Sequence, residues 1–492
     1  GYENSPLEDN SFEGYNIIEA PITKLTRETL KDSGLDGKSV GRSKNMFALG
    51  IVYWMFNRPM EQTEQFLKKK FAKKPEVVEA NIKVMHAGYN FADTIEALPS
   101  SYTVLSANLR KGTYRNVMGN QATAWGFLAA AERANKELFL GSYPITPASD
   151  ILHELAKHKN LGVKTFQAED EIAGICSAIG ASFTGSLAIT TTSGPGLALK
   201  GEALGLAIMT ELPLVVVDVQ RGGPSTGLPT KTEQSDLFQA LYGRNGESPA
   251  VILASSTPAN CFDWSYMASK ITLEHNTPVV LLSDGYLGNG AEPWNIKSTK
   301  DMPSITPNIA TEGEEYLPYK RDDRTLARKL ALPGTKGMEH RLGGLEKEDI
   351  TGNVSYDGDN HEKMCRIREE KINRIANIIP KQEVFGKEKG DLLVVGWGGT
   401  HGSLYSAVEK LQKEGLNISL SQFNYINPLP KNTAEILNNF NKIVVCELNN
   451  GQFVNYLRMK NQGVIFNQYN KLQGLPFTTS ELEDYFKKLL KN

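Results

Sequence analysis

Three short stretches of the chain combine residue types that could bind an anion or move a proton. The first is GSYPITPASD, residues 141–150, which lies between a predicted strand and a predicted helix. Thr146 stands where a helix N-cap is expected, and Pro147 stands at the first helical position. The free N–H groups of such a helix start, together with the Thr146 hydroxyl, could bind a substrate carboxylate. A well-capped helix without a ligand explains the same residues, so both interpretations stay open here.

The second stretch, residues 167–185, reads QAEDEIAGICSAIGASFTG and opens another predicted helix. It places Glu169, Asp170 and Glu171 at the helix start, where the helix dipole favours negative charge. Dipole complementation accounts for two of these three acids. A carboxyl group aimed into a crevice would lose its solvation, its pKa would rise, and it could share a proton with a ring nitrogen.

The third stretch, QRGGPSTGLPTKTEQSD at residues 220–236, directly follows the apolar run 214–219. Arg221 offers a planar fork that suits a bidentate carboxylate, and Thr230 is one of several hydroxyls that could add a hydrogen bond. A surface arginine in a flexible loop is the alternative interpretation.

A fourth stretch is similar to a dinucleotide-binding loop. GWGGTHG, residues 396–402, follows a predicted strand, but the next strand, ISLSQFNYI, offers no acid for a ribose. A nucleotide-dependent dehydrogenase therefore stays a minor alternative. The four cysteines are scattered and the histidines show no metal-ligand spacing, so we predict no metal site in this chain.

The elements around these stretches predict an α/β protein. Apolar runs recur at intervals of helical length, and this alternation predicts a doubly wound parallel sheet whose ligands bind beyond the carboxyl ends of the strands. Residues 290–360 have little periodic pattern, so we expect a cover over the active site or a mobile linker. Further apolar runs at 392–395, 418–423 and 443–448 predict a second, smaller α/β domain.

The composition narrows the class of partner. Among 492 residues, 54 Lys and Arg balance 56 Asp and Glu, which argues against a nucleic-acid or membrane partner. Few cysteines, no signal peptide and no long apolar run favour a cytoplasmic protein. The chain begins at Gly1 rather than Met, so we expect that an upstream segment was removed or is not included.

Taken together, YPITP, EDEIAG and QRGGPSTGLPT resemble the α subunit of 2-oxoacid:ferredoxin oxidoreductases, which are thiamine-diphosphate enzymes. The resemblance runs from about residue 115 to the C-terminus, and the first part resembles the later portion of a γ domain that some members carry fused ahead of α. It implies four parts: a γ-domain remnant over 1–105, a pyrimidine-binding domain over 116–290, an irregular linker or cover over 291–385, and a transketolase C-terminal-like domain over 386–492.

The resemblance also implies roles for individual residues. Thr146, Arg221 and Thr230 would contact the 2-oxo acid. Glu171 would hold the aminopyrimidine ring of thiamine diphosphate, and we choose it over Glu169 because thiamine enzymes generally carry a glycine nine residues beyond this acid, here Gly180. The remaining cofactor contacts would come from Tyr143, Pro144 and Ile145, so that Glu171, Thr146 and Arg221 form the catalytic group.

The implied reaction needs a partner. The chain has no motif for magnesium diphosphate, since Asp284 in SDGYLGN lacks the family context, and it has no cluster cysteines. A β subunit would supply Mg²⁺ and a [4Fe–4S] cluster, coenzyme A would take the acyl group, and ferredoxin the electrons. The segment GTKGMEH, residues 334–340, favours 2-oxoglutarate as substrate; pyruvate, a branched-chain 2-oxo acid and a non-catalytic assembly role are the alternatives.

Overall fold

The computed structural model describes residues 5–9, 11–95 and 101–491, and its contacts divide the chain into two compact units, residues 1–111 and 112–492. The smaller unit is helical. Its helices are α1 Ile22–Thr29, α2 Gly37–Arg42, α3 Lys44–Met55, α4 Glu61–Lys70 and α5 Pro75–Thr94. Two glycines let α3 and α5 cross closely: a Cβ at Gly50 would lie 2.0 Å from the Met85 carbonyl oxygen, and one at Gly88 would lie 2.0 Å from that of Phe47.

The larger unit contains the α/β architecture. Its strands are β1 Tyr114–Met118, β2 Leu138–Ser142, β3 Lys164–Gln167, β4 Leu187–Thr192, β5 Leu214–Gln220, β6 Val251–Ala254, β7 Pro278–Asp284, β8 Ala291–Asn295, β9 Gly390–Trp397, β10 Ile418–Phe423, β11 Tyr425–Asn427, β12 Phe440–Glu447 and β13 Asn467–Asn470. Its α-helices are α6 Gly119–Ala134, α7 Ser149–Leu155, α8 Glu171–Phe183, α9 Gly194–Leu199, α10 Gly201–Met209, α11 Leu237–Tyr242, α12 Cys261–His275, α13 Gly285–Asn289, α14 Gly358–Arg374, α15 His401–Lys413, α16 Thr433–Asn438, α17 Gln452–Lys460 and α18 Thr479–Lys491.

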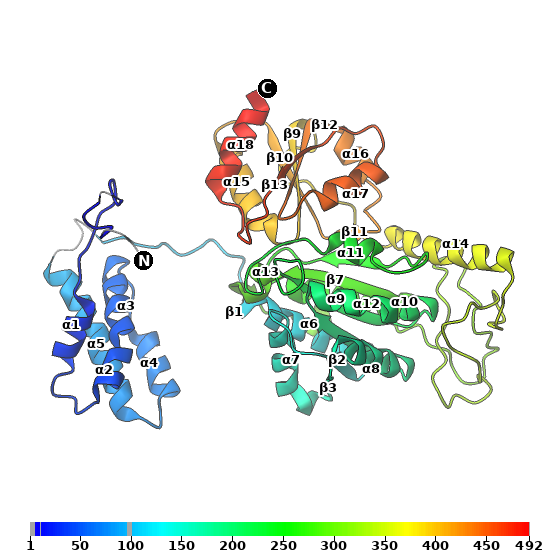
Figure 1. Ribbon diagram of the computed structural model, residues 1–492, viewed down its shortest axis with the longest axis horizontal. Helices are drawn as coiled ribbons and strands as arrows, with labels where there is room; N and C mark the ends of the chain where they lie inside the picture. Colours follow the sequence, from blue (N-terminus) through cyan, green and yellow to red (C-terminus); the bar gives the residue numbers. More distant parts are fainter. Residues whose placement is uncertain (1–4, 10, 96–100, 492) are drawn as a thin grey trace. The chain divides into compact units, whose positions relative to one another are not determined.

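A seven-stranded sheet forms the centre of this unit, in the order β11-β6-β7-β5-β4-β2-β3 (Figure 1). Every pairing is parallel except that of β11 with β6. Alternate residues of β5 enter different cores: Val215 and Val217 pack with α6, α7 and α12, while Val216 packs with α8 to α11. The sheet is therefore buried on both faces, which confirms the predicted doubly wound fold.

A second, four-stranded sheet follows in the order β10-β9-β12-β13, and all its pairings are parallel. Leu392 and Val394 face a core with α15 and α18, while Leu393 and Val395 join the core of the first sheet. The short strand β11, which follows β10 directly, leaves this sheet and becomes the edge strand of the first one. The two sheets thus share one hydrophobic core. The strand β11, which follows β10 in the chain and pairs with β6, connects them in addition to the covalent linker.

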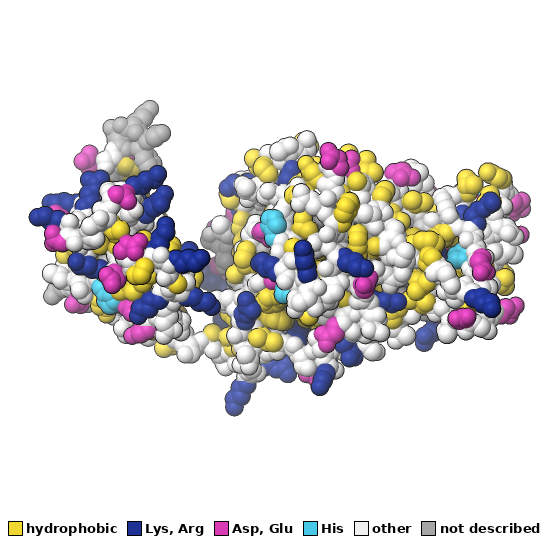
Figure 2. All heavy atoms as spheres, turned by 90° about the horizontal axis from the view of Figure 1, so that it is seen from below, with side chains coloured by type: hydrophobic (Ala, Val, Ile, Leu, Met, Phe, Trp, Pro, Cys, Tyr) yellow, Lys and Arg dark blue, Asp and Glu magenta, His cyan; other side chains and the backbone are white. Residues whose placement is uncertain are grey.

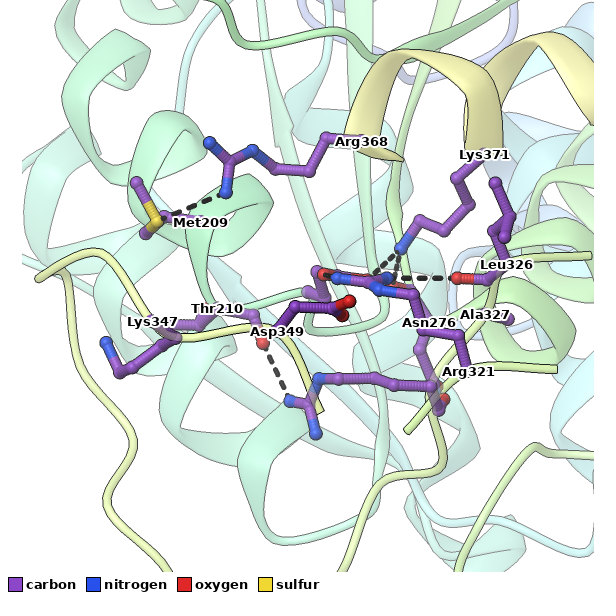
Figure 3. Close-up of polar contacts among 12 residues, drawn as sticks. Met209, Thr210, Asn276, Arg321, Leu326, Ala327, Lys347, Asp349, Arg368 and Lys371 are labelled. Atoms are coloured by element: carbon purple, nitrogen blue, oxygen red, sulfur yellow. Dashed lines mark hydrogen bonds and ion pairs between the residues drawn. The ribbon is translucent and has the colours of Figure 1, made fainter. Parts of the chain in front are cut away.

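The irregular stretch between the sheets is held by buried charges (Figure 3). Arg321 makes a two-pronged ion pair with Glu211, at 2.9 and 2.5 Å, and the Lys371 ammonium lies 2.5 Å from the same carboxylate. Arg328 donates to the Thr210 carbonyl at 2.7 Å. Burial alone would raise the pKa of Glu211, but the two cations hold it well below its ordinary value.

These anchors correct the expectation of a cover over the active site. Glu211 lies just before β5 and Asn276 lies just before β7, so both mark the amino ends of the strands. Asn276 donates to the carbonyls of Asn308 and Arg328, at 2.7 and 2.9 Å. The stretch from Asn308 to Lys371 therefore packs at the amino ends of the strands. Ligands of doubly wound sheets bind at the opposite edge, beyond the carboxyl ends of the strands.

The stretch is also less irregular than expected, because α14 forms within it. The buried side of α14 carries Arg368 and Lys371 beside Met364 and Ile372. Arg368 pairs with Glu346 at 3.0 Å, and Lys371 pairs with Glu211. The hydrophobic periodicity that normally reveals a helix is weakened wherever charged side chains replace apolar ones on the buried face.

Acidic and basic side chains are interspersed over the face of each unit that Figure 2 shows. This distribution agrees with the near-neutral composition of the chain. Within the described residues, no helix combines the length and the apolar character that crossing a membrane requires.

Candidate active site

The predicted site residues converge at one edge of the large sheet. Parallel strands end on the same side, and the segments that leave β2, β4 and β5 there are Tyr143–Thr146, Ser193–Gly196 and the loop that starts at Arg221. These strands are direct neighbours, in the order β5-β4-β2. Three stretches that are far apart in the sequence thus meet at the edge where doubly wound folds bind ligands.

Arg221 and Thr146 are in direct contact. The Arg221 guanidinium is 7% exposed, and its Nη1 donates to the Thr146 carbonyl oxygen at 2.7 Å. Its Nε is buried and has no hydrogen-bond partner among the described residues. One edge of the fork thus supports the backbone of the YPITP turn, and an orphaned donor remains that an anionic ligand could satisfy.

The helix after this turn begins later than predicted. Thr146 and Pro147 form a turn joined by a cis peptide bond, and α7 starts at Ser149 with Ala148 at the N-cap position. The prediction that Thr146 caps the helix is therefore wrong. Its side chain is exposed and has no hydrogen-bond partner among the described residues, so the hydroxyl is available to a ligand.

The other three residues of the YPIT segment have different environments. Tyr143 is 38% exposed, whereas Pro144 and Ile145 are half-buried. Ile145 packs against the core formed with α6 and α7, and its carbonyl accepts from the Ser149 amide at 3.0 Å. Ile145 therefore fixes the turn, while Tyr143 offers the exposed surface.

The loop closure brings the backbone of Thr230 near that of Arg221. No described contact joins their side chains. The loop closes on itself through a bridge between Gly222 and Leu228, and the Gly222 amide donates to the Lys231 carbonyl at 3.0 Å. Thr230 is exposed within this closed loop. Its predicted contact with a substrate stays a prediction.

Of the three acids near the start of α8, Glu171 alone is buried. Glu169 and Asp170 are exposed, and Asp170 caps the helix by accepting from the Ala173 amide at 2.7 Å. Glu171 is 8% exposed, and its carboxylate makes no hydrogen bond within the described residues. Its backbone carbonyl accepts from Lys200 Nζ at 2.7 Å, and this hydrogen bond holds the first residue of α8 in place.

A glycine allows the turn after β4 to pack closely against the Glu171 side chain. A Cβ at Gly196 would lie 2.8 Å from Glu171 Cγ, 3.1 Å from its Oε1 and 2.0 Å from Thr192 Oγ1. Glu171 is mostly buried and its carboxyl makes no hydrogen bond among the described residues, so it could accept a ligand ring nitrogen that completes its hydrogen bonds. The residues present thus fit the pyrimidine ring that the resemblance implies.

Sequence reasoning missed a second buried acidic feature beneath this site. Asp218 in β5 is fully buried beside Asp236, which precedes α11. Burial and the adjacent Asp236 raise the pKa of Asp218 well above its ordinary value, and burial raises the pKa of Asp236 to about 6. Two buried acids in contact hold at least one proton between them near neutral pH.

Asp236 of this acid pair packs closely against Gly194, in the turn that lies beside Glu171. A Cβ at Gly194 would lie 2.5 Å from Asp236 Oδ1, and Gly194 opens the same short helix as Gly196. An aspartate in the middle of the apolar strand LVVVDVQ was the available signal, because such a residue is rarely buried without a role or a partner.

The GWGGTHG loop serves a contact between the two sheets. The Gly399 amide donates to Asp284 Oδ2 at 3.2 Å, and a Cβ at Gly399 would lie 2.3 Å from that oxygen. A Cβ at Gly398 would lie 2.5 Å from Gln234 Nε2. The glycines are explained by this close packing, which leaves no space for a dinucleotide diphosphate at Gly398 and Gly399.

Asp284 has a structural role in this chain. Its Oδ1 accepts from the Tyr286 and Leu287 amides, at 2.8 and 2.9 Å, and caps α13. Its two oxygens are thus occupied by hydrogen-bond donors of the protein, including the Gly399 amide described above. This arrangement accords with the inference that SDGYLGN is no magnesium motif.

Comparisons with known proteins place the chain in a family. The family model "Pyruvate flavodoxin/ferredoxin oxidoreductase, thiamine diP-bdg" matches residues 130–356, and "Pyruvate ferredoxin/flavodoxin oxidoreductase" matches residues 4–91. The 2-oxoglutarate oxidoreductase subunit KorA of Mycobacterium tuberculosis is 48% identical over the whole chain, which spans 75% of that protein. Subunit alpha of 2-oxoacid:ferredoxin oxidoreductase 1 from Aeropyrum pernix is 31% identical over 97% of the chain and 75% of its own length.

A solved structure agrees in fold as well as in sequence. The 2-oxoglutarate:ferredoxin oxidoreductase from Magnetococcus marinus, described with 2-oxoglutarate, coenzyme A and succinyl-CoA bound, is 32% identical. It superposes with a TM-score of 0.86 over 94% of this chain and 80% of its own. Sequence identity along the full length and a shared fold lead to one conclusion: the chain belongs to the 2-oxoacid:ferredoxin oxidoreductase family.

Proposed function

We propose that this chain is the α subunit of a thiamine-diphosphate-dependent 2-oxoglutarate:ferredoxin oxidoreductase. The reaction would convert 2-oxoglutarate and coenzyme A into succinyl-CoA and CO₂, with two electrons passed to ferredoxin. The observation that carries the proposal is the buried, unpartnered Glu171 carboxyl beside Gly196, at the same sheet edge as Arg221 and Thr146. The choice of 2-oxoglutarate rests on the names of the relatives.

Thiamine diphosphate, when bound, supplies the carbon nucleophile and the electron sink that a 2-oxo acid needs for decarboxylation. Glu171 would hold a proton at its carboxyl group and donate it toward a ring nitrogen of the pyrimidine. Tyr143, Pro144 and Ile145 would line the ring.

The substrate would meet Thr146, Arg221 and Thr230. The Arg221 guanidinium lies beside the Thr146 turn and would attract the carboxylate next to the 2-oxo group, while the two threonine hydroxyls would orient it. These groups recognise a feature common to all 2-oxo acids. Selection of the distal carboxylate of 2-oxoglutarate would then come from other residues, including those of a partner.

We propose a β subunit as that partner. It would hold the diphosphate with Mg²⁺ and a [4Fe–4S] cluster, and it would pass electrons to ferredoxin. Within the described residues all four cysteines are free and scattered, so this chain offers no cluster-binding set there. Free cysteines also suit a reducing compartment, and we propose a cytoplasmic location for the complex.

The test is anaerobic viologen reduction by the chain co-purified with its β partner, with coenzyme A and thiamine diphosphate present. We expect 2-oxoglutarate to be used in clear preference to pyruvate and 2-oxoisovalerate. Preference for one of the other two acids would keep the chemistry and reject the substrate. No reduction with any acid, despite bound cofactor and cluster, would favour a non-catalytic assembly role.

Substitution of Glu171 separates catalysis from assembly. Glu171→Gln keeps the size of the side chain but removes the acidic proton, so we expect turnover to fall by about 10²-fold or more, the range for loss of a general acid–base. Glu169→Gln, which changes an exposed acid two residues away, is the matched control. Unchanged turnover in the Glu171→Gln complex would reject the catalytic role.

A further inference from the structure

A cluster of nucleophilic and basic side chains lies far from the candidate active site. It joins α14 to the preceding loop, at the amino-end side of the sheet. His361 and Cys365 stand four residues apart on α14 and so share one face of the helix. The Cys365 sulfur contacts the His361 ring, with Nε2 at 3.7 Å and Nδ1 at 3.9 Å, and Nδ1 also lies 2.8 Å from Glu346 Oε2.

This geometry is that of a thiol, a base and an acid that orients the base. A carboxylate at Nδ1 favours a proton on that nitrogen, which leaves Nε2 free to accept the thiol proton. Glu346 is suited to the part: burial alone would raise its pKa, but hydrogen bonds from Arg368 and His361 hold it below the ordinary value. The carboxylate is therefore ionised at neutral pH.

Arg368 adds a positive charge next to the sulfur. Its Nη2 lies 3.2 Å from Cys365 Sγ, and the guanidinium also binds both oxygens of Glu346, at 3.1 and 3.0 Å. Arg368 is only 4% exposed, so its charge acts with little screening by solvent. Basic side chains beside a partly accessible sulfur are the surroundings in which reactive cysteines are found.

The cluster is firmly held in place. Asp357 caps α14 by accepting from the Asn360 amide at 2.7 Å, and the Asn360 side chain donates to the Lys347 carbonyl at 2.9 Å. Glu346 therefore stands on a loop that is tied to the same helix as His361 and Cys365. Such support keeps the three side chains at working distances without a ligand.

The sulfur also has access to an open space. His361 and Cys365 line a cavity of about 620 Å³ whose other walls include Arg244, Tyr242 and Tyr456. Charged groups of both signs line it, since Arg366 and Lys460 are balanced there by Glu362 and Glu369. A small neutral or weakly charged molecule can therefore reach the sulfur without a large electrostatic barrier.

We propose that Cys365 is a reactive thiol that forms mixed disulfides with small-molecule disulfides entering this cavity. The Cys365 sulfur attacks one sulfur of the disulfide, the S–S bond of that molecule breaks, and one half leaves as a thiol. His361 takes the proton of Cys365 and returns it to the leaving sulfur. One disulfide is consumed and one is formed, so electrons balance without another oxidant.

A metal ion is the competing occupant, because Glu346, His361 and Cys365 place ligand atoms within 4.8 Å of one another. The position of Arg368 argues against it. The guanidinium already binds both Glu346 and the sulfur, and a divalent cation placed between them would meet its positive charge at close range. The contacts therefore favour a thiolate over a metal site.

The other cysteines provide an internal comparison. Burial and the nearby Glu202 raise the pKa of Cys176, which is exposed, and burial raises the pKa of Cys261 to about 11. Cys446 is buried as well, and its pKa is raised in the same way. Each of these three thiols is therefore disfavoured as a nucleophile at neutral pH.

The experiment treats the purified complex, at pH 7 and after removal of reductant, with limiting 2,2′-dithiodipyridine, and mass spectrometry follows each cysteine peptide. We expect Cys365 to react about tenfold faster than Cys176, and His361→Gln to slow Cys365 by about tenfold, since one pKa unit changes the thiolate fraction tenfold. His153→Gln, which changes an exposed histidine on α7, is the control and leaves the rate unchanged.

Two results would overturn the proposal. One is a Cys365 rate no greater than that of Cys176, or one that His361→Gln does not alter. The other is stoichiometric zinc in the purified complex that Cys365→Ser removes, which would make the cluster a metal site. Because Cys365 and His361 lie outside the candidate active site, viologen reduction by these variants reports separately on the proposed function.

Discussion

Substitution of Gly196 by alanine tests whether the close packing of Gly196 against Glu171 holds the Glu171 carboxyl in its working position. The new Cβ would lie 2.0 Å from Thr192 Oγ1 and 2.8 Å from Glu171 Cγ, well inside contact distance. Thr192 and Glu171 are both buried, so neither can move freely into solvent. Overpacking of this kind costs about 1–3 kcal/mol of stability. A displacement of Glu171 by about 1 Å would lower turnover by about 10²-fold, because catalytic groups tolerate little misplacement.

The assay is viologen reduction by the complex with 2-oxoglutarate, combined with chemical denaturation to measure the free energy of unfolding. Gly180→Ala is the matched control, since Gly180 lies in the same helix as Glu171 and a Cβ there meets nothing within 4 Å. We expect the control to keep full activity. A Gly196→Ala complex with wild-type turnover would refute the reasoning, because the position of the Glu171 carboxyl would then not depend on its close packing against Gly196.

Two further predictions concern buried acids. Glu211→Gln leaves Arg321 and Lys371 without their carboxylate, and we expect the free energy of unfolding to fall by about 3–5 kcal/mol, as for other broken buried ion pairs. The exposed Glu202→Gln on α10 is the control, and an equal effect there would contradict the prediction. The folded pKa of Asp236 is raised to about 6 from 3.8, so its contribution to stability is fully present below about pH 4 and is lost as pH rises through 6. Asp218→Asn removes a second buried acid whose pKa is raised well above its ordinary value, so the loss of melting temperature between pH 4 and 7 should be smaller than in the wild type.

Much of the fold was predictable because it depends on local pattern. Alternating apolar runs and helical segments indicated a doubly wound sheet and a smaller α/β domain, and the structure confirms both. The short stretches around Thr146, Glu171 and Arg221 indicated the family, which the comparisons confirm. The choice of Glu171 among three adjacent acids agrees with its burial, although its role in the reaction stays a prediction.

Other features depend on contacts that no local pattern encodes. α14 was missed because its buried face is built from Arg368 and Lys371, whose partners lie at Glu346 and Glu211. The cap expected at Thr146 was wrong because the Thr146–Pro147 turn delays the helix to Ser149.

The sequence by itself determined the alternation of strands and helices in the two α/β parts, the family and the three stretches that carry the candidate site. These follow from residue type and spacing, which are properties of short segments. Only the tertiary structure decided that Asp218 and Asp236 lie together in the core, that Arg221 supports the backbone at Thr146, and that the long linker lies at the amino ends of the strands. Each of these joins residues far apart along the chain, and burial gives them their energetic weight, because an unpaired charge or polar group is costly only where water is excluded.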